Sequence, residues 1–281
     1  MKAYDVLIAR GDRDHLDTLL ACGEIVPITG MLDEENAVSF YFDGGVLDEE
    51  IIARLESFVP AGSVRFERGE VAEQNWNLEF EKSLQPVAVT DDLIITQSWN
   101  AVDAPAGTLV VTIDPKMSFG TGHHESTRLI ARLMTTLDLT GRSLLDVGTG
   151  TGALAIIAAK RGATRIVAFD NNEWAVENTR ENIALNDVDD AIELFLGELD
   201  DLAAETFDVI VANLHRSLIT RLLPDLRARL AGPDARLLTS GVLIEDYDEL
   251  LAPARENGFE SIAEERENEW VATMFGLRHQ S

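Results

Sequence analysis

Three closely spaced glycines, Gly148, Gly150 and Gly152, follow directly after a short apolar run. The run from Ser143 to Val147 has the length and composition of a buried strand, and the residues from Ala153 onward are typical of a helix. Glycine enters backbone conformations that are closed to other residues, and without a Cβ it lets a ligand lie against the main chain. The sequence therefore predicts a strand, a ligand-binding turn and a helix.

An aspartate, Asp170, ends the next predicted strand, 22 positions after Gly148. A carboxylate at that place in a strand–loop–helix–strand unit can accept hydrogen bonds from both hydroxyls of a ribose. The two features together indicate a site for a ligand that contains adenosine. The alternative, that the glycines only turn the chain, is weaker because the strand, the helix and the distal acid occur together.

The spacing of the glycines distinguishes between adenosine-containing ligands. Dinucleotide-binding loops follow the pattern G-x-G-x-x-G and aim a helix N-terminus at a pyrophosphate. Here the pattern is G-x-G-x-G, and Asp146 precedes it. A carboxylate opposes a phosphate but suits an amino group and a sulfonium. S-adenosylmethionine is therefore the predicted ligand, and a nicotinamide dinucleotide is the weakest alternative.

Two polar residues follow another predicted strand, F-D-V-I-V-A. Asn213 could present its amide to the acceptor of a methyl group or to the methionine end of the donor. It could instead cap the following helix, because asparagine is common at helix N-termini. His215 is the second catalytic candidate, and neither residue is an evident general base.

The glycine- and hydroxyl-rich segment from Asp114 to Thr127 precedes a predicted helix and could fold over a bound ligand. Its adjacent histidines, His123 and His124, are further candidates for a general base. A metal site is not expected there, because adjacent rings on a loop chelate poorly and no cysteine or third histidine is near in sequence. We expect Ser126 or Thr127 to cap the helix, with a histidine at the rim of the pocket.

From Thr108 onward, strands and helices alternate, which predicts an α/β domain whose mostly parallel sheet has helices on both faces. Ligands of such sheets bind at the carboxyl ends of the strands, where Gly148 and Asp170 both fall. The expected strands are 109–113, 144–147, 165–169, 191–195, 209–212, 236–239, 259–263 and 270–275, and the expected helices are 125–136, 153–161, 173–185, 218–230 and 245–256.

Two shorter parts precede this domain. Residues 1–62 read as a small α+β domain, with strands at 4–9, 24–28 and 37–42 and helices at 13–22 and 48–58. This part has four basic residues against thirteen acids, so it could dock a basic partner or simply present a solvated acidic face. Residues 63–107 read as a linker helix, 72–83, followed by entry strands at 86–96. The predicted domains are thus 1–62, 63–107 as the connection, and 108–281.

The composition limits the classes of function. The 281 residues carry a formal net charge of −27, which argues against stable binding of nucleic acid and favours basic partners. Solubility or adaptation to salt could also explain the acidity. Cys22 is the only cysteine, which excludes an internal disulfide and a cysteine-based metal cage. No apolar run has the length of a membrane span or of a secretory signal, so we expect a cytoplasmic protein.

Several of these segments together resemble one family, the ribosomal protein L11 methyltransferases, also called protein methyltransferase A. They are F-G-T-G-H-H-E-S-T, L-L-D-V-G-T-G-T-G with Asp170, A-N-L, E-W-V-A, and N-W-N-L-E-F-E-K-S-L-Q-P-V at 75–87. The resemblance covers most of residues 72–281. It departs at Gln85, where relatives commonly have histidine, and residues 1–62 match only in length and pattern.

The resemblance implies a class I methyltransferase domain, Rossmann-like with a seven-stranded sheet, and a small N-terminal domain that recognises the ribosomal protein. It implies that S-adenosylmethionine is held by Thr127, Gly148, Asp170 and Asn213, to which the glycine loop adds Gly150. The implied reaction is methylation of lysine side chains and of the N-terminal amine of ribosomal protein L11. Two alternatives stay open, namely a methyltransferase for another protein or a small amine, and a non-catalytic cofactor-binding assembly module.

Overall fold

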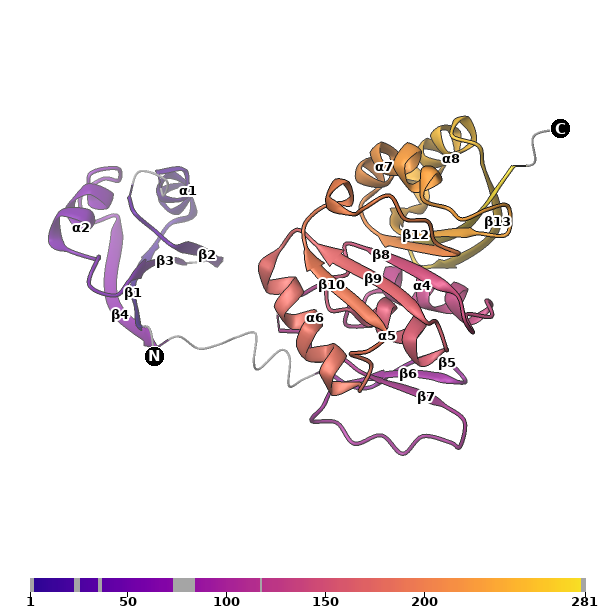
Figure 1. Cartoon of the computed structure of the whole chain (residues 1–281). Coiled ribbons are helices and arrows are strands. Elements are labelled where there is room, and N and C mark those ends of the chain that lie inside the picture. Colours follow the sequence, from indigo (N-terminus) through magenta and orange to yellow (C-terminus); the bar gives the residue numbers. More distant parts are fainter. Residues whose placement is uncertain (1–2, 23–25, 35–36, 73–83, 117, 279–281) are drawn as a thin grey trace. The chain divides into compact units, whose positions relative to one another are not determined.

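In the computed structural model, the described residues are 3–22, 26–34, 37–72, 84–116 and 118–278. They fall into two compact units, Met1–Trp76 and Asn77–Ser281. Figure 1 shows a sheet with helices packed beside it in the first unit and a larger sheet covered by helices in the second. None of the described helices is long and apolar enough to span a membrane.

The first unit is a four-stranded antiparallel sheet in the order β2-β3-β1-β4. Alternate residues of the central strands turn one face towards the helices, so that Phe40 and Phe42 pack with Leu16, Leu19 and Leu55 in one buried core. The elements are β1 (Ala3–Gly11), α1 (Arg13–Cys22), β2 (Gly30–Glu34), β3 (Ala37–Asp43), α2 (Glu49–Glu56) and β4 (Val64–Ala72).

Two sequence-based boundaries in this part differ from the structure. The second strand lies at Gly30–Glu34 rather than at 24–28, a range that contains Pro27, which has no N–H to donate to a sheet. The first unit does not end at residue 62, because β4 pairs with β1 along nine residues. The linker helix predicted at 72–83 lies outside the described residues, except for its first position.

The main sheet of the second unit confirms the predicted fold class. Its seven strands have the order β10-β9-β8-β11-β12-β14-β13, parallel from β10 to β12 and antiparallel at the other edge. The strands are β8 (Ser143–Val147), β9 (Arg165–Asp170), β10 (Ile192–Leu196), β11 (Val209–Asn213), β12 (Arg236–Leu243), β13 (Phe259–Glu267) and β14 (Trp270–Leu277).

Helices cover both faces of this sheet and bury two separate cores. Helices α4 (Glu125–Thr135), α5 (Ala153–Lys160) and α6 (Glu173–Leu185) contribute to one core. Helices α7 (Arg216–Ala228) and α8 (Tyr247–Glu256) contribute to the other. The strands are apolar on both faces because both faces are buried, which is why they read as continuous apolar runs in the sequence.

The strand expected at 109–113 forms but lies in a different sheet. As β7 (Leu109–Thr112) it pairs in parallel with β6 (Leu93–Thr96), which pairs with β5 (Val87–Thr90). On its other side, amide side chains of α6 take the place of a neighbouring strand. Asn186 accepts from the N–H of Thr112 at 3.0 Å and donates to its carbonyl at 2.6 Å.

Two more asparagines on the same face of α6 continue this arrangement. Asn182 accepts from the N–H of Asp114 at 2.9 Å, and Asn178 donates to the carbonyl of Asp114 at 2.8 Å. Residues four apart on a helix lie one above the other, so Asn178, Asn182 and Asn186 form a polar stripe. This asparagine stripe fixes the chain where it leaves β7 and enters the segment 115–124.

A buried carboxylate joins the glycine loop to α5. Asp146 is 1% exposed, and its Oδ2 accepts from the Thr149 hydroxyl at 2.7 Å and from the Ala155 N–H at 3.2 Å. Burial is the main cause that raises the pKa of Asp146, the two hydrogen bonds lower it, and the charge of Asp170 raises it. Together these effects bring the pKa to about 7. The folded protein therefore disfavours the ionised form of this acid.

Asp146→Asn should therefore stabilise the fold in a pH-dependent way. The folded-state pKa lies above the unfolded value, so the stability that the neutral acid gives is complete below about pH 4 and is lost as the pH rises towards 7. Asparagine stays neutral and can accept the same hydrogen bonds. Its advantage in the free energy of unfolding should grow between about pH 4 and pH 7 and reach a few kcal/mol, up to about 4.

Urea denaturation at pH 5.5, 6.5 and 8 measures this advantage. Asp138→Asn is the matched control, because hydrogen bonds from Thr140 lower the pKa of that exposed acid, so its replacement should bring no gain at pH 8. An Asp146→Asn variant that is less stable than the wild type at every pH would contradict the assignment.

Candidate functional site

The residues that the sequence singles out on three strand ends line one cavity. Its volume is about 840 Å³, and it opens at the carboxyl ends of β8, β9 and β11. Gly148, Gly150, Asp170, Asn213 and His215 are all on its wall. The parallel sheet explains this convergence, because the carboxyl ends of neighbouring parallel strands meet at one edge.

The glycine loop lies in close contact with the segment that precedes α4. Thr151 donates from its N–H to the carbonyl of Phe119 at 2.9 Å and from its hydroxyl to the carbonyl of Gly120 at 2.8 Å. A Cβ on Gly150 would stand 2.3 Å from the Phe119 oxygen, and its φ of +59° is in the left-handed region. Only glycine permits both this conformation and this approach.

Asp170 holds the loop and still has room for a ligand. Its Oδ2 accepts from the Gly150 N–H and its Oδ1 from the Asn172 N–H, both at 3.0 Å. A carboxylate has about four positions at which it can accept hydrogen bonds, so each oxygen can accept one more. Two free acceptor positions side by side on the cavity wall suit the two hydroxyls of a ribose.

Asn213 is the last residue of β11, and its amide joins two parts of the site. Its Nδ2 donates to the hydroxyl of Thr127 at 3.2 Å. Its Oδ1 is buried without a hydrogen-bond partner among the described residues. Thr127 is 1% exposed and does not line the cavity, so it positions Asn213 from behind. The helix-cap alternative for Asn213 is excluded, since His215 caps α7.

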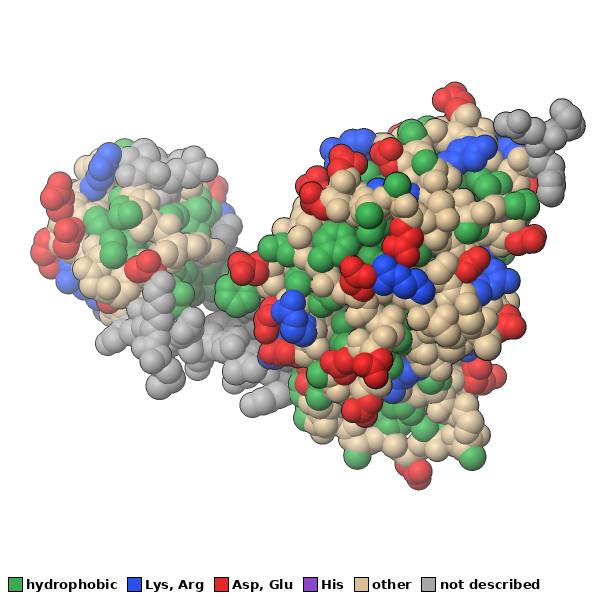
Figure 2. Space-filling view, in the orientation of Figure 1, with side chains coloured by type: hydrophobic (Ala, Val, Ile, Leu, Met, Phe, Trp, Pro, Cys, Tyr) green, Lys and Arg blue, Asp and Glu red, His purple; other side chains and the backbone are tan. Residues whose placement is uncertain are grey.

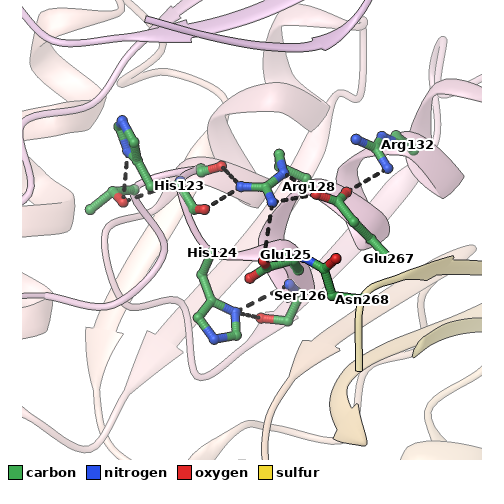
Figure 3. Close-up of polar contacts among 10 residues, drawn as sticks. His123, His124, Glu125, Ser126, Arg128, Arg132, Glu267 and Asn268 are labelled. Carbon is green, nitrogen blue, oxygen red and sulfur yellow. Dashed lines mark hydrogen bonds and ion pairs between the residues drawn. The ribbon is translucent and has the colours of Figure 1, made fainter. Parts of the chain in front are cut away.

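The histidines have different surroundings (Figure 3). His124, rather than Ser126 or Thr127, caps α4, since its Nδ1 accepts from the Ser126 N–H at 3.2 Å. The ring of His123 turns away, with Nε2 2.9 Å from the carbonyl of Gln85, and is not on the cavity wall. Among the described residues, no group of three histidine, cysteine, aspartate or glutamate side chains could hold a metal.

An aromatic wall, which the sequence did not predict, closes one side of the cavity. The ring of His124 contacts those of Phe119 and Trp270, with centroid distances of 5.0 and 4.6 Å, and all three residues line the cavity. Phe119 is 53% exposed. Phe119 stands in the motif F-G-T-G-H-H-E-S-T and Trp270 in E-W-V-A, and this was the only signal in the sequence. The contact itself joins residues almost 150 positions apart, so no local pattern predicts it.

Acidic side chains dominate the charged part of the cavity wall. Glu198, Asp200 and Asp225 line it together with Asp170, and Arg221 is the only lysine or arginine among the described lining residues. Asp146, which the sequence argument placed beside the ligand, is not on the wall. Glu198, Asp200 and Asp225 nevertheless give the wall the negative charge that was expected from Asp146, and this charge favours an amino group or a sulfonium over a pyrophosphate.

These features fit S-adenosylmethionine. The glycine loop leaves space where a Cβ would stand, Asp170 has free acceptor positions, and the buried Oδ1 of Asn213 needs a donor. The acids at the wall suit the two positive charges of the ligand.

Comparisons with known proteins agree with this geometry. The family model for ribosomal protein L11 methyltransferase (PrmA) matches residues 12–277. A protein of Chlorobaculum tepidum called ribosomal protein L11 methyltransferase is 43% identical over 218 residues, which is 76% of this chain and 75% of that protein. A protein of the same name from Phocaeicola vulgatus is 33% identical over 266 residues, 93% of this chain and 94% of the other.

A solved structure also matches. The ribosomal protein L11 methylase of Lactobacillus delbrueckii subsp. bulgaricus is 26% identical, and the match covers 70% of this chain and 100% of that chain with a TM-score of 0.64. The family model covers both units of the chain and almost its whole length. The chain therefore belongs to the ribosomal protein L11 methyltransferase family.

Proposed function

We propose that this chain transfers methyl groups from S-adenosylmethionine to ribosomal protein L11, at lysine side chains and at the N-terminal amine. The observation that carries the proposal is the shared cavity wall of Gly148, Gly150, Asp170 and Asn213, at the carboxyl edge of a methyltransferase sheet. The family membership supports the same enzyme class and cofactor.

Each of these residues has a role that its surroundings support. Asp170 would bind the ribose hydroxyls through its free acceptor positions, and the main chain at Gly148 and Gly150 would lie against the ligand. Asn213 would accept a hydrogen bond from an amino group through its unpartnered Oδ1. Thr127 holds the amide of Asn213 in that orientation.

Bound S-adenosylmethionine supplies a methyl group that its sulfonium makes electrophilic. The chain's own residues have to align the acceptor and deliver it as a neutral amine. A lysine amine with a pKa of about 10.4 costs about 4 to 5 kcal/mol to deprotonate near neutral pH, whereas an α-amine near 8 costs about 1. Glu198, Asp200 and Asp225 attract the protonated amine, and Asn213 can accept an N–H from the neutral one.

The substrate class follows from charge as well as from the family. Residues 1–62 have four basic residues against thirteen acids, and acidic side chains are spread over both units on the face shown in Figure 2, with basic ones among them. Such a surface attracts a basic protein and is repelled by RNA phosphates. The first unit is thus assigned to recognition of free L11 in the cytoplasm.

Methyl transfer to free ribosomal protein L11 tests the proposal. The full chain should transfer label from S-adenosylmethionine to this protein, and mass spectrometry should locate it on amines. Residues 77–281 alone should bind the donor but lose most of this activity. The cut belongs after Trp76, because a cut after residue 62 would leave β4 without β1. Absence of label from the full chain would refute the proposed substrate, and full activity of the shortened chain would favour a small-amine enzyme.

Gly150→Ala tests the ligand cradle, by which we mean the main chain at Gly148 and Gly150 against which the ligand would lie. The added Cβ would stand 2.3 Å from the Phe119 carbonyl oxygen, so the loop or the segment above it must move. Affinity for S-adenosylmethionine, measured by calorimetry, should fall by at least about tenfold, the equivalent of about 1.4 kcal/mol.

Gly141→Ala is the matched control for this substitution. Gly141 also has a positive φ, of +72°, but a Cβ added there would meet nothing within 4 Å. It should lose stability through backbone strain while it keeps its affinity for the donor. Equal affinities of the Gly150→Ala variant and the wild type would rule out the cradle.

A further inference from the structure

We infer that His124 and His215 face the cavity as neutral hydrogen-bond donors, each with its single proton on Nε2, and that neither removes the proton of the acceptor amine. The inference deepens the proposed function and rests on it for the identity of the acceptor. It concerns the two histidines on the cavity wall, which by residue type are the natural candidates for a general base.

The main chain determines which nitrogen carries the proton. At α4, the Ser126 N–H donates to Nδ1 of His124 at 3.2 Å. At α7, the Leu218 N–H donates to Nδ1 of His215 at 3.3 Å. A backbone N–H can only donate, so each Nδ1 must be an unprotonated acceptor, and the proton of the neutral ring lies on Nε2.

The same local pattern occurs at both helices. Each histidine is the N-cap residue, and each is followed two positions later by a serine whose hydroxyl lies near the same Nδ1, Ser126 at 2.8 Å and Ser217 at 2.9 Å. Serine, threonine, aspartate and asparagine are the preferred N-caps. A histidine offers in addition a second polar atom, and among the described residues Nε2 of neither ring has a hydrogen-bond partner.

Taking up a proton would damage both caps. A protonated imidazole has an N–H at both nitrogens, so Nδ1 would oppose the backbone donor that it now accepts from. The N-terminus of a helix also disfavours a positive charge. A general base has to hold the proton that it takes up, and these two rings would lose a helix cap in doing so.

Further contacts fix the orientation of His124. Its ring contacts the rings of Phe119 and Trp270, and Figure 3 shows the polar contacts of the surrounding residues. Arg128 donates to the carbonyls of Gly122 and His123 and forms an ion pair with Glu267 on β13, and Arg132 pairs with the same glutamate at 2.7 Å.

Asn268 completes this network by donating to Glu125 at 2.9 Å. The segment before α4 is therefore fastened to the turn that leads into β14. With ring contacts to Phe119 and Trp270 and a hydrogen bond at Nδ1, the imidazole of His124 has little freedom to turn.

A donor at Nε2 binds an oxygen atom. The ligands of the proposed reaction carry suitable oxygens in the carboxylate of the methyl donor and in the main-chain carbonyls of the acceptor protein. The proton of the acceptor ammonium then leaves to water before the methyl group is transferred, and the histidines orient the reactants.

Substitution of each histidine by asparagine and by glutamine distinguishes three roles: a hydrogen-bond donor, a general base, and a helix cap without a role in binding. Asparagine reproduces Nδ1 and caps a helix well, but it has nothing at the position of Nε2. Glutamine reaches the position of Nε2 with an N–H but does not reproduce the cap. Neither amide can take up a proton at neutral pH.

For a donor, His124→Asn should lose at least about tenfold in kcat/KM, the value of one hydrogen bond to a charged or carbonyl oxygen. Both variants lose the ring contacts with Phe119 and Trp270, so the cap is read from their difference: His124→Gln should melt lower than His124→Asn but retain more activity at a temperature where both are folded. The same pair at His215 gives an independent comparison. A loss of affinity for S-adenosylmethionine, measured by calorimetry, would identify the carboxylate of S-adenosylmethionine as the group that accepts from Nε2. A raised KM for L11 alone would identify a carbonyl of the acceptor protein.

Equal and nearly complete loss of kcat in both variants, with both folded, would overturn the inference in favour of a base. Full activity of the asparagine variants would overturn it in favour of a cap without a role in binding. Nitrogen-15 NMR of ring-labelled histidine in the ligand-free full chain at pH 8 decides the tautomer separately. It should show Nδ1 unprotonated and Nε2 protonated in both residues, assigned with the single variants.

A protonated Nδ1, or an averaged signal from two tautomers, would contradict the assignment. The NMR result does not depend on the substrate. If the wild type transferred no label to L11, the proposed function would fail while the protonation of His124 and His215 could still be read.

Discussion

The main-chain hydrogen bond from Thr151 to Phe119 is the contact on which the shape of the cavity depends. It brings the segment before α4 onto the glycine loop, and it exists only because Gly150 has no Cβ. On one side of the contact is the cradle that Asp170 holds through the Gly150 N–H. On the other is Phe119, which begins the aromatic wall.

This segment is fixed at both of its ends by polar contacts. The asparagine stripe of α6 binds the main chain of Thr112 and Asp114 where the segment begins. At the other end, Arg128 and Glu267 join it to β13. A buried hydrogen bond contributes only about 1 kcal/mol on average, but leaving its donor or acceptor unpaired costs more. The many paired groups therefore hold the described residues at the two ends of the segment in place.

The sequence was sufficient for the parts of the site that follow from strand ends. Gly148, Asp170 and Asn213 could be brought together without a structure because parallel strands align their carboxyl ends. The partners of α6 could not be predicted, because its asparagines bind a strand about 70 residues away and no local pattern encodes that distance. For the same reason β7 was expected in the main sheet, although it pairs with β6. The prediction that Ser126 or Thr127 caps α4 was wrong, because hydroxyl side chains are the commoner N-caps, while the structure uses the ring of His124.

The acids of the second unit differ in their environment and in what they can contact. Burial raises the pKa of Asp146 to about 7 and keeps this acid off the cavity wall, whereas the carboxylates on the wall have access to the ligand. Those carboxylates favour the protonated form of an incoming amine, which raises its concentration at the site but opposes the loss of its proton. Nδ1 of each cavity histidine already accepts a backbone N–H at a helix cap, so this nitrogen is not free to take the proton from the amine. An α-amine, which loses its proton at far lower cost than a lysine, is for this reason the acceptor that such a site can use with the least help.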